Sequence, residues 1–296
     1  MVRMDKAYSV SLIYRNEDQH IMPCIDSVFN QTIKPKKMVI VDDRSTDSTF
    51  DIIQKKEEVY PELYAVQIHQ PRHKFKGYNI SMAINHSIQT LLTLCDTTYI
   101  MRMDSDICLN NPNYVETLLN TLEGNPRIGI TGGVSDKGKF MTRHVTDAAR
   151  IYRRECLLEL LKTSPNPGYL ILYGHDSFMI FRAKWLGWEV KPVNITFWDA
   201  RPYRRSMKRW FLTGRFRYMN GFNFIHQFIS CIRYFRHKPY FIGSTVAFFT
   251  YLLSNLRPYR ILDKSYYDFM KRDLKQIVLS GLRNSFYSKI LRRTIY

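Results

Sequence analysis

Cysteine is scarce in this sequence, and no two cysteines form a Cys-x-x-Cys pair. The 296 residues contain five cysteines, at positions 24, 95, 108, 156 and 231. Disulfide-stapled domains use cysteines in even numbers, and cysteine-rich metal sites use closely spaced pairs. The pattern argues against both classes and predicts reduced thiols in a cytosolic setting.

Acidic residues are also few. Lys and Arg number 44 against 26 Asp and Glu, which gives a formal net charge of +18 at pH 7. The positive excess is concentrated from Arg201 to the end, whereas residues 1–110 are nearly balanced. This composition predicts a negatively charged partner for the second part of the chain: phosphate, nucleic acid or an anionic membrane surface.

Long apolar runs are missing as well. Residues 1–17 contain no apolar core of a secretory signal, so we expect the N-terminal part to face the cytosol. Residues 239–256 are uncharged, but Gly, Ser, Thr and Asn dilute them, and a bilayer span needs about 20 apolar residues. Basic residues on both flanks favour a segment that lies on an anionic membrane surface. A spanning helix and a soluble helical subdomain stay open.

Strand and helix patterns alternate through residues 1–130. Continuous apolar runs such as Met38–Val41 are typical of parallel strands buried on both faces. The expected strands are 8–13, 36–43, 63–69 and 97–104, and the expected helices are 21–31, 48–58 and 77–94. This alternation predicts a doubly wound α/β domain.

Aspartate pairs stand where two of these strands end. Asp42 and Asp43 close one strand, and Asp104 and Asp106 close another. Ligands of open α/β sheets bind beyond the carboxyl ends of the strands, and residues i and i+2 of an extended chain lie on one side, about 6.5 Å apart. An isolated Asp-Ser-Asp is commonly a turn with a helix cap. Two pairs together predict a site for a cation or a ligand with many hydrogen-bond donors.

Five sets of residues recur in a recognisable order. They are VSLIYRNE (10–17), SVFNQT with MVIVDDRSTDST (27–49), GYNISMAINHSI (77–88), MRMDSDI (101–107) and GHDSFMIFRAKWLGWEV (174–190). As a set they resemble the family 2 glycosyltransferases, which are inverting enzymes of the GT-A fold with nucleotide-sugar donors. The resemblance implies a Rossmann-like doubly wound mixed sheet in a domain at 1–205, with a nucleotide-sugar-binding half at 1–130 and an acceptor half at 131–205.

The resemblance assigns the donor nucleoside to the ends of the first two strands. The implied residues are Tyr14, Asn16, Glu17, Asp42 and Asp43, with Asp104 near the ribose. Carboxylates suit this role because they accept hydrogen bonds from a base N–H or a ribose hydroxyl. Tyr14 is interpreted equally well as a core aromatic.

The resemblance also implies a metal site at the diphosphate. Asp106 would bind Mg²⁺ or Mn²⁺, which prefer hard oxygen ligands. Many relatives carry a His before an Arg-Pro pair, and here Asp199 stands in that neighbourhood as a second candidate ligand. Arg201 and Arg204 are candidates to bind the diphosphate, although a solvated basic turn explains them equally well.

The implied catalytic base is Asp176. The family carries a Glu-Asp pair at the start of a helix behind the acceptor, and this sequence has His175-Asp176 instead. His175 would contact the acceptor or tune the acid. The alternative for Asp176 is that it only caps the helix that follows.

The resulting prediction is a metal-dependent inverting glycosyltransferase that uses a UDP- or GDP-sugar and a glycan or lipid-linked acceptor. Residues 206–296 are expected to be helical and to rest on the cytosolic face of a membrane. The alternative is a basic nucleic-acid-binding protein or a nucleotidyltransferase on a Rossmann-like scaffold. The basic half lacks a recognisable nucleic-acid-binding motif, so we expect no nucleic-acid partner.

Overall fold

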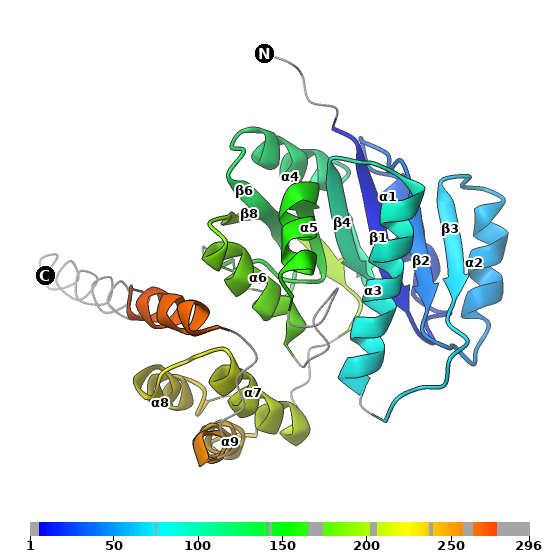
Figure 1. The fold of residues 1–296 in the computed structure, drawn as a ribbon. Helices are drawn as coiled ribbons and strands as arrows, with labels where there is room; N and C mark the ends of the chain where they lie inside the picture. The colour runs from blue at the N-terminus through cyan, green and yellow to red at the C-terminus, as the bar shows by residue number, and fades with distance from the viewer. Residues whose placement is uncertain are drawn as a thin grey trace, which may run out of the picture. The chain divides into compact units, whose positions relative to one another are not determined.

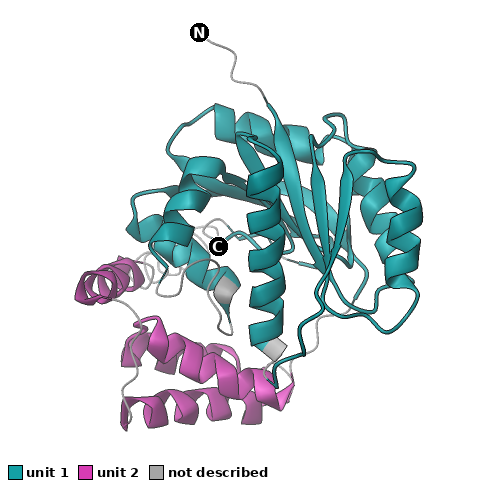
Figure 2. Ribbon diagram, turned by 45° about the vertical axis from the view of Figure 1, so that its right-hand side comes forward, with its two compact units in different colours: residues 1–202 teal, residues 203–296 magenta. Residues whose placement is uncertain are grey.

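The computed structural model describes residues 6–74, 76–138, 140–141, 144–164, 174–201, 206–236, 239–256 and 263–276, with Lys76 and His175 described by their backbone alone. The chain divides into two compact units, residues 1–202 and 203–296 (Figure 2). The domain limit at 205 and the division of the first domain at 130 stay predictions. Each unit is described by itself below.

The first unit alternates strands and helices, as the sequence pattern predicts (Figure 1). Its strands are β1 (Tyr8–Tyr14), β2 (Met38–Asp42), β3 (Leu63–Gln67), β4 (Tyr99–Asp104), β5 (Ile107–Cys108), β6 (Ile128–Ser135), β7 (Ala149–Arg153) and β8 (Glu189–Asp199). Its helices are α1 (Ile21–Phe29), α2 (Thr49–Glu57), α3 (Lys76–Leu94), α4 (Tyr114–Glu123), α5 (Arg154–Lys162) and α6 (His175–Trp185). The predicted α/β class is confirmed.

The eight strands form one mixed sheet in the order β3-β2-β1-β4-β7-β6-β8-β5. Strand β7 runs antiparallel to both of its neighbours, β4 and β6, and β6 is parallel to β8. The carboxyl ends of β1, β2, β3, β4, β6 and β8 therefore meet at one edge of the sheet. The strands that carry the aspartate pairs, β2 and β4, are not adjacent, because β1 lies between them and pairs with both.

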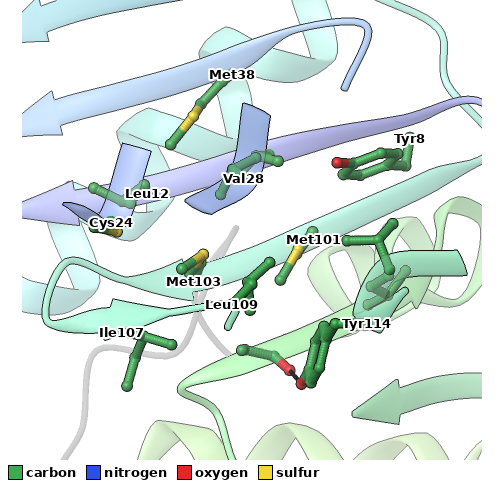
Figure 3. Close-up of a cluster of buried hydrophobic side chains, with 14 of the residues drawn as sticks. Tyr8, Leu12, Cys24, Val28, Met38, Met101, Met103, Ile107, Leu109 and Tyr114 are labelled. Atoms are coloured by element: carbon green, nitrogen blue, oxygen red, sulfur yellow. Dashed lines mark hydrogen bonds between the residues drawn. The ribbon is translucent and has the colours of Figure 1, made fainter. Parts of the chain in front are cut away.

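Helices cover both faces of this sheet. On one face, alternate residues of β1 and β4, among them Tyr8, Leu12 and Met101, share one core cluster with residues of α1, α2 and α4. Figure 3 shows part of this cluster, with Cys24 and Val28 of α1 and Tyr114 of α4. On the other face, Val39 and Val41 of β2 pack with apolar residues of α3, α5 and α6. Alternate strand residues point to opposite faces, so a strand buried on both sides reads as a continuous apolar run.

The second unit is helical, as predicted. Within its described residues, the helices are α7 (Met207–Met219), α8 (Phe224–Arg233), α9 (Ile242–Leu256) and the helix at 264–276. Ser206 and Asn223 cap α7 and α8 with their side-chain oxygens. Helices α7 and α9 pack tightly at Gly214, where an added Cβ would lie 2.1 Å from the carbonyl oxygen of Ala247. None of the helices in the described ranges combines the length and apolarity needed to cross a membrane.

Candidate active site

The carboxyl edge of the sheet collects acidic side chains from distant parts of the chain. Asp42, Asp104 and Asp199 are the last residues of β2, β4 and β8. Asp106 follows in the turn between β4 and β5. Ser105 and Asp106 form a turn, so the extended backbone expected from Asp104 to Asp106 is wrong.

The short strand β5 brings Asp106 next to Asp199. Ile107 pairs with Asp199, and the Ala200 N–H donates a hydrogen bond to the Asp106 carbonyl oxygen at 3.0 Å. Burial raises the pKa of Asp199, and the negative charge of Asp106 raises it further, while the Arg201 N–H lowers it. The two candidate metal ligands are therefore close enough to repel each other, which a cation relieves.

These side chains suit a divalent ion that is shared with a diphosphate. Asp106 keeps 24% of its side-chain surface exposed, and both candidates offer hard carboxylate oxygens. Across the described ranges, no group of three or more His, Cys, Asp or Glu side chains is placed to hold a metal by itself. Mg²⁺ sites of this kind use one or two carboxylates and take their other ligands from phosphate and water.

Arg201 supplies a positive charge at the same place. Its guanidinium forms an ion pair with the nearly buried Glu17 and lies 3.5 Å from the Asp106 carboxylate. Partial burial lowers the pKa of Arg201, but the hydrogen bond and charge of Glu17 and the charge of Asp106 outweigh it. In this structure the guanidinium is engaged with carboxylates, and its contact with a diphosphate stays a prediction. Arg204 lies outside the described residues.

Hydrogen bonds join the loop after β1 to the loop after β2. The Asn16 N–H donates to the Ser45 hydroxyl at 3.0 Å, and the Thr46 N–H donates to the Asn16 side-chain oxygen at 2.9 Å. The Glu17 N–H donates to the Thr49 hydroxyl at 2.9 Å. Asn16 and Glu17, both predicted to bind the nucleoside, therefore lie on a connected pair of loops at the carboxyl edge.

The adjacent aspartates of β2 have different surroundings. Asp42 is fully buried, and its carboxylate accepts hydrogen bonds from the Ser45 N–H at 2.8 Å and the Gln67 amide at 3.0 Å. These bonds hold the turn after β2, and donor binding by Asp42 stays a prediction. Asp43 pairs with Arg44 and with Arg72, the latter at 3.2 Å. Burial raises the pKa of Asp43, and the two arginines oppose it.

Tyr14 belongs to the hydrophobic core. Its side chain is buried in the cluster that β1 forms with α1. Burial raises the pKa of Tyr14, and the charge of Asp42 adds to the effect. This position favours the core-aromatic interpretation over nucleoside binding.

A series of ion pairs begins at the partly exposed Asp104 and continues through the nearly buried Arg102, Asp147 and Arg150. Arg102 pairs with Asp104, and its Nε lies 3.8 Å from the Asp147 carboxylate. Asp147 also pairs with Arg150 at 2.6 Å, and the Arg150 guanidinium donates a hydrogen bond to the Asp176 carbonyl oxygen at 3.1 Å. The series Asp104, Arg102, Asp147, Arg150 and Asp176 connects the Asp-Ser-Asp stretch to the first turn of α6.

Asp104 is unusual in this network. Solvent still reaches 40% of its side-chain surface, yet the protein packed around the carboxyl displaces enough water to raise its pKa to about 6. The positive charge of Arg102 opposes this shift, and the negative charges of Asp147 and Asp106 add to it. A bound cation or hydrogen-bond donor at this place would favour the charged carboxylate.

Asp176 lies in the first turn of α6 and does not cap it. The N-cap is Gly174, whose φ of 80° is the left-handed conformation that glycine adopts at little cost. Helix α6 leads through a tight turn into β8, with the Trp188 N–H bonded to the Ala183 carbonyl oxygen, so its N-terminus points to the edge where β8 ends. The capping alternative for Asp176 is therefore wrong. The His175 side chain lies outside the described residues.

The sequence argument missed several side chains of this site. Arg72, Arg102, Asp147 and Arg150 carry the ion pairs described above, and His144 lies near Asp176. Burial lowers the pKa of His144, and the charge of Asp176 opposes that shift. Arg102 could have indicated these ion pairs from the sequence, because an arginine inside an apolar strand is rarely buried without an acidic partner.

Comparison with known proteins agrees with this geometry. Residues 9–187, more than half of the chain, match the family described as Glycosyl transferase family 2. A stretch of 105 residues is 35% identical to a chondroitin synthase of Escherichia coli, covering 36% of this chain and 14% of that protein. The chain thus matches only a small part of that relative's length.

Two solved structures share the fold. A mannosyltransferase from Pyrobaculum calidifontis, in complex with GDP-Man and Mn²⁺, superposes with a TM-score of 0.57 at 16% identity, over 96% of this chain and 83% of that chain. TarS 1–349 of S. aureus, in complex with UDP-GlcNAc, gives a TM-score of 0.53 at 14% identity, over 85% and 73%. With the family match across its first unit, this chain belongs to glycosyl transferase family 2 and is a glycosyltransferase of the GT-A fold.

Proposed function

We propose that this glycosyltransferase is metal-dependent and inverting, and that it moves a sugar from a UDP- or GDP-sugar to a hydroxyl of a glycan or lipid-linked acceptor. The observation that carries the proposal is the convergence of Asp104, Asp106, Asp199 and Arg201 at the carboxyl edge of the sheet. The complexes of the two similar structures, one with GDP-Man and Mn²⁺ and one with UDP-GlcNAc, are consistent with it.

Different side chains are proposed to bind different parts of the donor. Asn16, Glu17 and Asp43 lie where the nucleoside is expected, and Asp104 lies near the expected ribose. Asp106 and Asp199 would hold Mg²⁺ or Mn²⁺, which when bound stabilises the charge that develops on the departing nucleoside diphosphate. Arg201 adds hydrogen bonds to the same phosphates.

Asp176 acts as the base at the acceptor end. It takes the proton of the acceptor hydroxyl while that oxygen bonds to the anomeric carbon and the bond to the nucleoside diphosphate breaks. One displacement of this kind inverts the configuration at that carbon. A positioned general base contributes about 10²- to 10⁴-fold in rate. The bond from Arg150 to the Asp176 carbonyl oxygen supports the turn that carries this carboxylate.

The basic part of the chain supports a negatively charged partner. Between Asp199 and Asp263 the sequence has twelve Lys and Arg residues and no Asp or Glu. Such a segment attracts the phosphate of a lipid-linked acceptor and the anionic lipids around it. We therefore propose that the second unit rests on the cytosolic face of a membrane.

Nucleoside diphosphate release tests the catalytic proposal. The parent protein is incubated with a panel of UDP- and GDP-sugars, with Mn²⁺, with Mg²⁺ or with a chelator. We expect metal-dependent release from one donor, and a loss of about 100-fold in release for Asp176→Asn with donor binding retained. Asp96→Asn is the matched control, because the Asp96 side chain is exposed and pairs only at the surface with Arg154. Release that is equally fast in Asp176→Asn and the control would contradict the role of Asp176.

A further inference from the structure

Helix α8 exposes its apolar side and buries its polar side, which is the reverse of a surface helix in a water-soluble protein. Its large apolar side chains are exposed by 43 to 64%, and its buried side chains are Gln227, Ser230 and Cys231. The exposed residues are Phe224, Ile225, Phe228, Ile229 and Ile232. Their spacing puts them on one face of the helix, opposite the buried polar residues. Water alone does not favour this orientation.

The buried side of α8 is held in place by polar contacts. The Arg217 guanidinium of α7 donates a hydrogen bond to the Gln227 side-chain oxygen at 2.8 Å. Arg217 also lies over the rings of Phe222 and Tyr234, which flank α8. The Asn223 cap fixes the start of the helix. These contacts define which side of α8 faces the unit, so the outward apolar face follows from the fold.

The apolar face continues onto α9 through aromatic contacts. Phe224 and Phe228 both lie edge-on to Phe248, at centroid distances of 5.8 and 6.1 Å, and Phe248 contacts Phe249. Phe249 and Leu253, one turn apart on α9, are exposed by 58 and 60%. The five α8 residues with Phe248, Phe249 and Leu253 form one surface, called the α8 face below. Exposed apolar surfaces of this extent mark interaction sites.

The charges of the second unit favour one kind of partner for the α8 face. Arg233 is the last residue of α8 and Arg236 follows three residues later, and both are exposed. Lys208 and Arg215 on α7 are exposed as well. The whole segment between Asp199 and Asp263 lacks acidic residues. An amphipathic helix with an apolar face and basic neighbours matches an anionic lipid surface, where acyl chains take the apolar side chains and phosphates pair with Arg and Lys.

We infer that the α8 face inserts into the interfacial layer of a bilayer rich in anionic lipid. The inference rests on the proposed function for the membrane partner, and it names the residues that enter the lipid. The sequence pattern pointed instead to residues 239–256 as the membrane segment. Of that segment, the α8 face includes only Phe248, Phe249 and Leu253 on α9.

Vesicle co-flotation of the full chain tests this inference. The probes are phosphatidylcholine vesicles with and without about one third phosphatidylglycerol, at about 100 mM salt. The variant is the triple change Ile225→Ser, Phe228→Ser and Ile229→Ser, which alters only exposed side chains. The matched control is Val59→Ser with Leu94→Ser, two exposed apolar positions in the first unit. We expect the parent and the control to float with anionic vesicles, and the triple variant to bind at least about tenfold more weakly.

The outcomes of this experiment distinguish a lipid surface from a second copy of the chain as the partner of the α8 face. The inference is overturned if the parent does not float with anionic vesicles, or if the triple variant binds them as tightly as the parent does. Parent molecules that pair in solution, lose that pairing in the triple variant and show no vesicle binding would assign the α8 face to a second copy of the chain. Nucleoside diphosphate release is measured in the same samples, because the α8 face lies outside the predicted donor residues. Release without flotation refutes only the membrane contact, and flotation without release refutes only the proposed chemistry.

Discussion

Arg150 connects two parts of the candidate site. Its side chain is fully buried, and it joins Asp147 on one side to the Asp176 carbonyl oxygen on the other. Truncating one member of a buried ion pair leaves the other charge without compensation. Arg150 is therefore expected to matter both for stability and for the position of Asp176.

The first prediction concerns this pair. We expect Arg150→Met to lower the free energy of unfolding by about 3 to 5 kcal/mol, because Asp147 loses its closest cation. Urea unfolding measures the change. Arg127→Met is the control, because Arg127 is exposed and its loss costs little. Equal losses in the two variants would show that the buried network does not stabilise the sheet edge.

The second prediction concerns the backbone of Arg44. This residue has a φ of 60° in the turn after β2, a conformation that costs a non-glycine residue about 1 kcal/mol. Arg44→Ala and Arg44→Gly both remove the ion pair with Asp43. We expect the glycine variant to be more stable than the alanine variant by about 1 kcal/mol in thermal or urea unfolding. If alanine is equal or better, the turn is not strained at this residue.

At the residue scale, the sequence predicted acids at the sheet edge but not their individual surroundings. Asp42 and Asp43 are adjacent in sequence, yet one carboxylate is enclosed by Ser45 and Gln67 and the other pairs with arginines. Arg72 comes from a loop after β3, and no local pattern connects it to Asp43. Pairings of this kind depend on the tertiary fold, so periodicity alone does not reveal them.

At the scale of elements, the sequence pattern did not predict the short strand β5. It has two residues, too few to give a periodic signal, and it pairs with β8 from the far end of the first unit. This pairing places Asp106 beside Asp199. The longer elements of the first 130 residues were predictable because their apolar runs and helical spacing extend over many residues.

The third prediction belongs to the contact between α7 and α9. Gly214 lets the helices approach so closely that an added Cβ would lie 2.9 Å from Thr250 as well as against the Ala247 carbonyl. We expect Gly214→Leu to destabilise the second unit by about 1 to 3 kcal/mol or more, since backbone must move. Circular dichroism during heating detects it. Gly124→Ala is the control, because an added Cβ at this helix end would lie 3.3 Å from the Asn120 carbonyl oxygen, a much milder approach than at Gly214. An unchanged melting curve for Gly214→Leu would contradict the close packing.

For the whole molecule, the acidic residues of the proposed active site and the excess of basic residues lie in different parts of the chain. The first unit carries the acids of the proposed donor site, and the segment between Asp199 and Asp263 carries no acid at all. The order of the family motifs was visible in the sequence, so fold and enzyme class were predictable and are confirmed. The orientation of α8 was not, because its apolar residues face outward and hydropathy patterns assume that such residues face a core.

The fourth prediction follows from this division. Raising the salt concentration from about 50 to about 500 mM screens exposed charges. We expect vesicle binding by the full chain to weaken markedly, while nucleoside diphosphate release without vesicles changes little. Co-flotation and release assays at several salt concentrations measure both. Vesicle binding that is insensitive to salt would show that the basic residues contribute nothing to attachment.

We propose that Asp106 holds the donor diphosphate through a divalent ion at the carboxyl edge of the sheet. Calorimetric titration of the parent, Asp106→Asn and Asp96→Asn with UDP- and GDP-sugars, with and without Mn²⁺, tests it most directly. We expect that one donor binds the parent and Asp96→Asn only with Mn²⁺, and that Asp106→Asn weakens this binding by about 100-fold or more, equivalent to about 2.7 kcal/mol. Donor binding that is the same without Mn²⁺, or the same in Asp106→Asn, would contradict it.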